Sequence, residues 1–351
     1  MKISDFDYNL PEELIAQTPI EPRDNSRLLI MDKNWNINEN KFFEIANYLW
    51  ENDVLVLNET RTINARLFGE IDIFPNWNKE IKKVEIFLHK QISLDTWECL
   101  GYPGKNLKIW RNIRFFDEKW VLVLNWLIEK ISDMWRFIKF DKSSFEFLQI
   151  IDSLWELPLP PYITKKLENS ERYQTVYAKH HWSAASPTAW LHFTNELLEK
   201  LINLWVKIEK VLLHVWVGTF KPVETDDITN HYMHSEYIEI QKEVAERLNE
   251  YKKNWKNIIA VWTTCVRVLE SFSDENGILD YWNKETSIFI YPGYKWKIVN
   301  ELITNFHLPK STLLMLISSL WWKENIKKAY NYAIKNKFRF FSFWDAMWIK
   351  K

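Results

Sequence analysis

Tryptophan and glycine occur in this chain in nearly the reverse of their usual proportions. The 351 residues include 21 tryptophans and only 6 glycines, whereas a soluble domain of this length carries roughly 25 glycines at average usage. Many tryptophans also stand where a turn needs a residue that tolerates positive φ. Examples are Asn34-Trp35-Asn36, Asn76-Trp77-Asn78, Asn254-Trp255-Lys256 and Tyr281-Trp282-Asn283. An indole is badly placed in such turns, which Asn-Gly or Gly-Asn pairs usually form.

We interpret this exchange as a matter of translation. If UGA codons are written as tryptophan although the organism reads them as glycine, both the excess of tryptophan and the shortage of glycine are explained at once. The alternative is a protein that is rich in tryptophan by nature. That alternative leaves the turns unexplained.

Length, charge and cysteine usage set broad bounds. A chain of 351 residues suggests two domains, because single cores stop growing near roughly 250 to 300 residues. The net charge is only -1, so a polyanionic partner would have to meet local basic patches. Cys99 and Cys265 have no CxxC or metal-like spacing, which favours a reducing compartment. Residues 1–17 lack a signal pattern and the apolar run 313–320 is too short to span a bilayer, so we expect a cytoplasmic protein without a membrane partner.

The pattern of apolar residues divides the chain. Residues 53–58 read as a buried strand, and short apolar segments then alternate with turns up to about residue 151, as in a small antiparallel barrel or sandwich. These segments are residues 84–88, 113–116, 121–124 and 137–140. After a turn at residues 158–161, helical and strand patterns alternate, which indicates an α/β sheet. The expected helices are at 197–202 and 237–251, and the expected strands at 211–215, 258–261 and 288–290.

The predicted fold is therefore an α/β main domain with an inserted antiparallel β-barrel-like domain. Residues 1–61 and 154–351 would form the α/β catalytic domain, and residues 62–153 would form the insertion.

Several segments become specific once the suspect tryptophans are read as glycine. Residues 187–194 become PTAGLHFT, 213–220 LHVGVGTF, 261–267 VGTTCVR and 342–347 SFGDAM. Further segments, as written, are PLPPYI at 158–163, MHSEY at 233–237, YPGY at 291–294 and LITNFHLPKST at 302–312. From SDFDYNLP at 4–11 to the last ten residues, the chain closely resembles the S-adenosylmethionine:tRNA ribosyltransferase-isomerase family of queuosine biosynthesis.

The resemblance implies a specific reaction. Members of that family move and isomerise the ribosyl unit of S-adenosylmethionine onto 7-aminomethyl-7-deazaguanine at the tRNA wobble position, which gives epoxyqueuosine-tRNA, adenine and methionine. S-adenosylmethionine is thus a co-substrate and tRNA the partner. A sulfonium acidifies the neighbouring C5′ protons, so a positioned base can start the rearrangement. The chemistry needs no metal, and the sequence holds no HExxH or Cys/His cluster, so we expect no metal site.

Four residues are candidates for proton transfer. His192, His214 and His307 each sit beside an apolar run within a family-like motif and could act as base, acid or nucleobase contact; a structural histidine is the alternative for each. Glu236 lies two residues after His234, on one face if the segment is a strand, and this pair suits proton handling or ribose binding. The alternative there is a surface turn that enters the following helix.

A second group is predicted to bind the co-substrate. Thr188 lies in the PTAG segment, and Thr263 and Thr264 belong to a turn that would end a strand at the edge of the sheet where ligands of α/β proteins lie. Arg267 follows on a helix, three residues before Glu270, with an intrahelical ion pair as the alternative role.

Lys310 and Ser311 open the apolar helix at 313–320. A lysine beside a helix N-terminus can seat the methionine carboxylate or a tRNA phosphate. The alternative is simple capping by Ser311.

Basic residues near aromatic ones are predicted to contact RNA. The set comprises Arg61, Lys105, Lys108, Arg111, Lys337 and Arg339. Charge runs of this size are also found on ordinary solvated faces. Where the family usually has aspartate this chain has Glu59, two residues before Arg61, which leaves the role of position 59 open.

The resemblance also sorts the tryptophans. Those that match family glycines are Trp110, Trp155, Trp182, Trp190, Trp205, Trp216, Trp262, Trp322 and Trp344, whereas Trp97, Trp296 and Trp348 read as genuine.

Two other function classes stay open. A non-catalytic RNA-binding module would release no adenine, and a methyltransferase would yield S-adenosylhomocysteine. Oligomeric state, and which residue is the base, are not indicated.

Overall fold

The computed structural model contains two compact units. It describes residues 1–18, 20–62, 66–74, 78–117, 119–132, 135–142, 144–153, 180–183, 192–215, 223, 225–321, 323–340 and 345–350. Among these, residues 1–61, 180–181 and 192–350 belong to one unit, and residues 62–153 and 182–183 belong to the other. The exact limits predicted for the insertion, 62 and 153, stay a prediction.

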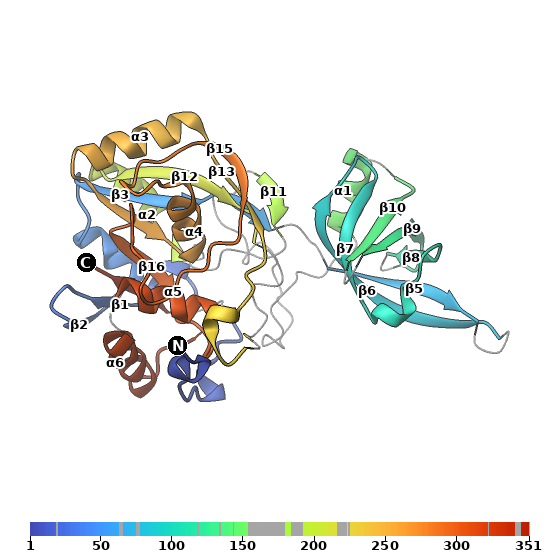
Figure 1. Cartoon of the computed structure of the whole chain (residues 1–351), viewed down its shortest axis with the longest axis horizontal. Coiled ribbons are helices and arrows are strands. Elements are labelled where there is room, and N and C mark those ends of the chain that lie inside the picture. The colour runs from blue at the N-terminus through green and yellow to red at the C-terminus, as the bar shows by residue number, and fades with distance from the viewer. Residues whose placement is uncertain are drawn as a thin grey trace. The chain divides into compact units, whose positions relative to one another are not determined.

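The larger unit is built on a nine-stranded mixed sheet (Figure 1). Its strands are β1 (Arg27–Met31), β2 (Ile37–Lys41), β3 (Asp53–Asn58), β12 (Lys207–Leu213), β13 (Glu236–Ile240), β14 (Asn257–Val261), β15 (Trp282–Thr286), β16 (Glu301–Asn305) and β17 (Ala346–Ile349). Their order across the sheet is β15-β13-β12-β3-β14-β16-β17-β1-β2. This confirms the predicted α/β class of the main domain.

Four neighbouring strands at the centre of the sheet run parallel: β12, β3, β14 and β16. All six residues of β3 are buried, which explains its uninterrupted apolar pattern. Because these strands are parallel, their last residues meet at one edge, which we call the carboxyl edge. β13 is antiparallel to β12 and β17 to β16, so both of these strands begin there. After β3 the chain forms β12 on one side and later β14 on the other, the arrangement at which open α/β sheets bind ligands.

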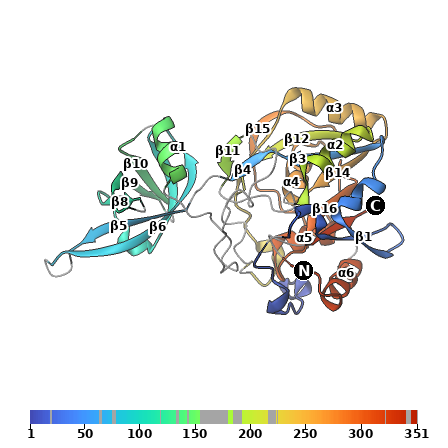
Figure 2. The same ribbon diagram turned by 180° about the vertical axis from the view of Figure 1, so that it is seen from behind.

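Helices accompany this sheet, as both views show (Figures 1 and 2). They are α2 (Asn195–Asn203), α3 (Lys242–Lys253), α4 (Thr263–Phe272), α5 (Thr312–Leu320) and α6 (Lys323–Lys335). α4 packs on β12, β3 and β14 and reaches β13, which brings its first turns close to the carboxyl edge. A separate two-stranded sheet pairs β4 (Thr60–Thr62) with β11 (His180–Ser183).

The second unit is a closed six-stranded barrel, which confirms the predicted barrel-like insertion. Its strands are β5 (Arg66–Ile73), β6 (Glu80–Gln91), β7 (Thr96–Tyr102), β8 (Asn112–Phe116), β9 (Leu122–Ser132) and β10 (Trp135–Phe140), followed by α1 (Ser144–Ser153). Its core holds the fully buried indoles of Trp97 and Trp126. The ring centroid of Trp126 lies 4.1 Å from that of Phe115 and 4.3 Å from that of Phe140.

Two expected elements were wrong in their positions. The helix predicted at 237–251 begins only at Lys242, because residues 236–240 form β13, whose alternate residues are buried. Apolar residues at 238, 240, 244 and 248 fit both the period of a strand and the period of a helix over so short a span. The strand predicted at 288–290 lies instead at Trp282–Thr286, where an edge strand of mostly exposed residues gives no apolar signal.

Tryptophan dominates the left-handed backbone conformations of this protein. Nine non-glycine residues among those described have positive φ, and seven of them are tryptophans: Trp35, Trp110, Trp120, Trp205, Trp255, Trp262 and Trp282. Such angles are uncommon for any residue with a Cβ atom and are outliers for bulky ones.

Candidate active site

Asn58, the last residue of β3, joins two strands at the carboxyl edge. Its Nδ2 donates to the carbonyl of Leu213 at 3.0 Å, while its Oδ1 accepts from the backbone N–H groups of Leu213 and Thr60 at 3.1 and 3.2 Å. The same Nδ2 lies 3.4 Å from Oγ1 of Thr264 in the first turn of α4. An amide that both donates and accepts can hold the ends of β3, β12 and α4 together.

His214 directly follows β12 at this edge. Its Nδ1 lies 3.1 Å from Oγ1 of Thr60, and its ring stacks on Tyr237 with centroids 5.4 Å apart. The ring is half-buried, so it reaches the molecular surface although two neighbours fix its plane. Burial raises the pKa of Tyr237 to about 12, helped by a hydrogen bond to Glu239, so its hydroxyl remains protonated near neutral pH.

Arg267 and Glu236 form an ion pair that connects α4 with the start of β13. Both side chains are almost wholly buried, at 5% and 2% exposure. Burial lowers the pKa of Arg267 to about 10, so the guanidinium stays charged at neutral pH. Its Nε and Nη2 atoms have no acceptor in the described part of the chain. A buried charged donor without an acceptor is costly, which marks this guanidinium as a group that can receive a ligand.

The alternative role of Arg267, an intrahelical ion pair with Glu270, is wrong. Glu270, one turn further along α4, does not pair with it but accepts hydrogen bonds from three successive backbone N–H groups, of Lys297, Ile298 and Val299, at 3.0 to 3.2 Å. The hydroxyl of Tyr294 adds a fourth at 3.1 Å. Glu270 therefore anchors the loop before β16, and α4 directs Arg267 toward Glu236 instead.

His192 lies at the same edge but is fully enclosed. Its Nδ1 is 2.8 Å from Oγ of Ser26 and its Nε2 is 3.2 Å from Oδ1 of Asn305, the last residue of β16. Burial lowers its pKa to about 4. A neutral imidazole that donates from Nε2 to the amide oxygen and accepts the serine hydroxyl satisfies both contacts. This geometry favours a structural role over the predicted catalytic one.

His307 is enclosed as well, and burial lowers its pKa to about 3. Its Nε2 lies 3.0 Å from Oγ1 of Thr304. Its backbone contacts two tyrosines: the hydroxyl of Tyr8 donates to its carbonyl, and its N–H donates to the hydroxyl of Tyr330 at 2.7 Å. The residue ties the N-terminal segment to α6, so a structural role is favoured here too.

Lys310 and Ser311 stand before α5. The Lys310 ammonium pairs with Asp7 at 3.0 Å, and both side chains are about half exposed, at 48% and 45%. Ser311 Oγ accepts from the N–H of Leu314 at 3.2 Å and donates to the carbonyl of Leu308 at 2.7 Å. The predicted cap is confirmed, whereas the ammonium predicted to seat an anion already has an acidic partner.

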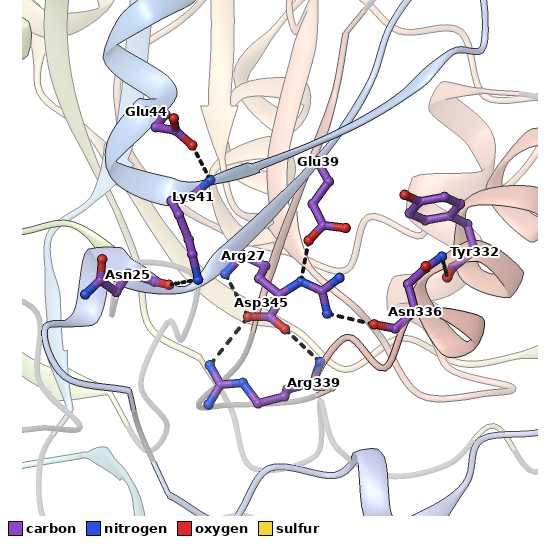
Figure 3. Close-up of polar contacts among 9 residues, drawn as sticks. All are labelled: Asn25, Arg27, Glu39, Lys41, Glu44, Tyr332, Asn336, Arg339 and Asp345. Atoms are coloured by element: carbon purple, nitrogen blue, oxygen red, sulfur yellow. Dashed lines mark hydrogen bonds and ion pairs between the residues drawn. The ribbon is translucent and has the colours of Figure 1, made fainter.

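Asp345 and Arg339 belong to a polar cluster at the start of β17 and β1 (Figure 3). The Asp345 carboxylate, fully buried, accepts from the backbone N–H groups of Arg27 and Arg339 at 2.8 Å each. The Arg339 guanidinium approaches the same carboxylate at 3.4 Å, and that of Arg27 donates to Glu39 at 2.7 Å. Arg339, predicted to contact RNA, is thus engaged within the protein, while Lys337 beside it is exposed.

The predicted RNA contacts in the barrel cluster in one segment, residues 102–111. Lys105 and Lys108 are exposed and form no ion pair with the other described residues. Arg111 is half-buried, and its guanidinium donates to the carbonyl of Asn106 at 2.7 Å. Tyr102 is 70% exposed.

A family model described as "Queuosine biosynthesis protein" matches residues 3–349. The chain belongs to this family. A protein of Fusobacterium nucleatum named S-adenosylmethionine:tRNA ribosyltransferase-isomerase is 49% identical over 349 residues, 99% of this chain and 96% of that one. A protein of the same name from Acetivibrio thermocellus is 49% identical over the full length of both chains. The crystal structure of S-adenosylmethionine tRNA ribosyltransferase from Thermotoga maritima is similar with a TM-score of 0.55 and 33% identity, covering 99% of this chain and 100% of that one.

For this family member, the structure brings together part of the predicted site. Glu236, His214, Thr264 and Arg267 gather where β3, β12 and β14 end and β13 begins. The buried Thr263 opens α4 at the same place. Thr188 lies outside the described residues, as does the side chain of Arg61.

Sequence reasoning missed Asn58, Thr60 and Tyr237. A polar residue that directly ends a buried strand, as Asn58 does, is a signal that could have found the first. Within the described residues there is no group of three or more His, Cys, Asp or Glu that could hold a metal ion. No helix in that part of the chain is long and apolar enough to cross a membrane.

Proposed function

We propose that this chain is an S-adenosylmethionine:tRNA ribosyltransferase-isomerase whose active site is the carboxyl edge around Arg267, Glu236 and His214. The substrates are S-adenosylmethionine and tRNA that carries 7-aminomethyl-7-deazaguanine at the wobble position. The products are epoxyqueuosine-tRNA, adenine and methionine. The names of full-length relatives at 48–49% identity support this reaction. Action on tRNA implies a cytoplasmic location.

The buried guanidinium of Arg267 is the observation that carries the assignment of the site. Two of its nitrogens lack an acceptor among the described residues, although the side chain is only 5% exposed. A carboxylate or the ribose hydroxyls of a bound donor would supply those acceptors, because a guanidinium presents a planar fork of donors. Glu236 positions this fork through its own ion pair, so we assign it a positioning role in place of proton transfer.

His214 is the histidine best placed to take the proton from C5′. It is half-buried at the carboxyl edge, and Thr60 and Tyr237 hold its ring. Its imidazole can therefore face both the protein and a bound molecule, which the enclosed His192 and His307 cannot do. A positioned base of this kind contributes about 10² to 10⁴ in rate.

The first turn of α4 completes the donor site. Thr264 is tied to Asn58, and the positive end of a helix N-terminus favours a carboxylate such as that of the methionine moiety. No protein residue is required to hold a metal ion in this scheme, since the sulfonium itself activates C5′.

The barrel segment 102–111 is the proposed tRNA contact. Arg136 fixes its backbone by donating to the carbonyls of Leu107 and Gly104 at 3.1 and 3.2 Å. The exposed Tyr102 ring can stack on an unpaired base while Lys105 and Lys108 meet phosphates. A segment ordered before binding loses less conformational entropy on binding.

Product analysis tests the function. Incubation with S-adenosylmethionine and tRNA bearing the aminomethyl-deazaguanine should release adenine and methionine in equal amounts and leave an epoxy-cyclopentane nucleoside after digestion. Formation of S-adenosylhomocysteine would indicate a methyltransferase instead, and tRNA binding without adenine release would indicate a binding module. Arg267→Lys should weaken donor binding, because lysine lacks the planar fork.

A further inference from the structure

Three turns in this protein share one set of hydrogen bonds. In the first, the N–H of Trp35 donates to the carbonyl of Asp32, whose own N–H donates to the carbonyl of Asn36, both at 3.0 Å. The Asp32 carboxylate accepts from the N–H groups of Asn34 and Asn36 at 2.8 and 2.9 Å. Trp35 has φ 68°.

The second turn repeats this pattern around Asp117 and Trp120, and the third around Asp274 and Gly277. The fourth residue donates to the aspartate carbonyl at 2.9 Å in both. The aspartate carboxylate accepts two N–H groups at 2.8 to 2.9 Å in both. The φ angles of the fourth residues are 61° and 73°. The third turn therefore shows glycine in the position that tryptophan fills in the other two.

Two helix ends give the same result. After α2, Trp205 N–H donates to the carbonyl of Ile202 and the next N–H, of Val206, donates to that of Leu201. After α3, Trp255 and the residue after it repeat both bonds. This is the Schellman motif, whose left-handed residue is usually glycine. The two indoles are 70% and 90% exposed, so little burial offsets the strain of φ 63° and 57°.

Trp262, between β14 and α4, has the backbone conformation that is least compatible with a side chain. Its φ of 85° and ψ of 158° fall in a region that is essentially restricted to glycine. The indole is only 7% exposed. The backbone N–H is held in place by the carbonyl of Ile303 at 2.7 Å, so the turn cannot relax freely.

From these geometries we propose that the seven tryptophans at positive φ are glycines in the protein that its organism makes, and that glycine at position 262 opens the turn before α4 to the ribosyl donor. The seven are Trp35, Trp110, Trp120, Trp205, Trp255, Trp262 and Trp282. The second step rests on the proposed function, because it assumes that a donor binds near α4.

Tryptophans in the core set the contrast. Trp97, Trp126 and Trp348 are buried in strands, and Trp348 Nε1 donates to Glu301 at 2.8 Å. Deleting such a side chain leaves a cavity. These three remain tryptophan in the proposal.

The gene and the native protein test the first step. UGA should encode the seven positions and UGG the three core positions, and peptide masses of the protein isolated from its source organism should contain glycine at the seven. UGG codons at the seven positions, or tryptophan in those peptides, would overturn it.

Variants test the second step with a matched control. The parent carries glycine at all seven positions, and two further proteins keep tryptophan at one position only, 262 or 255. Position 255 is the better control because it precedes β14, whereas 262 follows it, at the opposite end of the strand. Keeping Trp255 should lower Tm by roughly 2 to 4 °C and leave S-adenosylmethionine affinity unchanged.

Keeping Trp262 should weaken S-adenosylmethionine binding by about tenfold or more, which corresponds to about 1.4 kcal/mol, as measured by calorimetric titration. Equal donor affinity of the parent and this variant would contradict the proposal that glycine at position 262 opens the turn to the donor. If the parent binds the donor tightly but releases no adenine with modified tRNA, the proposed reaction fails and the opened turn stands.

Discussion

His214 and the two enclosed histidines lie at the same edge of one sheet and yet differ in what they can do. His192 and His307 are buried, and burial lowers their pKa values to about 4 and about 3. His214 is half-buried and stacked on Tyr237. A histidine at the end of a strand is thus a candidate for catalysis. Whether its ring is enclosed then decides between a structural and a catalytic role.

Two buried charged groups, Asp345 and Arg267, differ in the same way. The carboxylate of Asp345 is enclosed by donors from Arg27 and Arg339, whereas the Arg267 guanidinium keeps two nitrogens without an acceptor among the described residues. We therefore expect changes around Arg267 and His214 to alter ligand binding and turnover. Changes in the enclosed clusters should alter stability.

The largest expected effect comes from Glu236→Ala. It leaves the Arg267 charge buried without its partner, which costs about 3 to 5 kcal/mol of unfolding free energy. Urea denaturation measures this loss. Glu39→Ala is the control, since it removes an exposed partner of Arg27 and should cost no more than about 1 kcal/mol. Similar losses in the two variants would contradict a special role for the buried pair.

Next is the effect of His214→Ala on turnover. Removing the base should lower kcat by about 10² or more with little change in donor affinity, as measured by adenine release. His192→Gln keeps an amide near Asn305 and should retain kcat in the folded fraction. If His192→Gln loses turnover without losing stability while His214→Ala keeps it, the two histidines have been assigned the wrong way round.

The pH dependence of stability should report the enclosed histidines. Their pKa values in the folded protein, near 4 and 3, lie below the unfolded value of about 6.5. Between these values the unfolded chain binds more protons than the folded one. The contribution of each histidine to stability therefore falls as the pH decreases from about 6.5 to the folded pKa. Each histidine should cost about 1 kcal/mol at pH 5.5 relative to pH 7. Urea midpoints at both pH values measure it, and His192→Gln should lose about 1 kcal/mol less than the parent protein between pH 7 and pH 5.5; an equal loss would show that His192 is not enclosed in solution.

Lys310→Ala should have the smallest effect. Its pair with Asp7 is half exposed, so the unfolding free energy should change by less than about 1 kcal/mol. Because the ammonium already has a partner, donor and tRNA affinities should fall by only a few-fold in binding titrations. A loss of more than about tenfold in donor affinity would restore the anion seat that the sequence suggested.

Sequence patterns predicted most of the fold because the core strands are strongly apolar. β3 and β14 lie almost where their apolar runs predict them, and Ser311 caps α5 as its position indicates. The edge strand β15 was misplaced since its exposed residues carry no apolar signal. Tyr237 was assigned to a helix for the related reason that five residues are too few to distinguish the two periods.

The sequence by itself determined the class of fold, the resemblance on which the reaction rests, and the suspicion that tryptophan replaces glycine, because each depends on residue types and their order along the chain. Only the tertiary structure decided which histidine is enclosed, that Arg267 pairs with Glu236 in place of Glu270, and that seven particular tryptophans have positive φ. Burial, partner choice and backbone angle arise from segments far apart in sequence, such as residues 26, 192 and 305 around one imidazole. No local pattern encodes those distances.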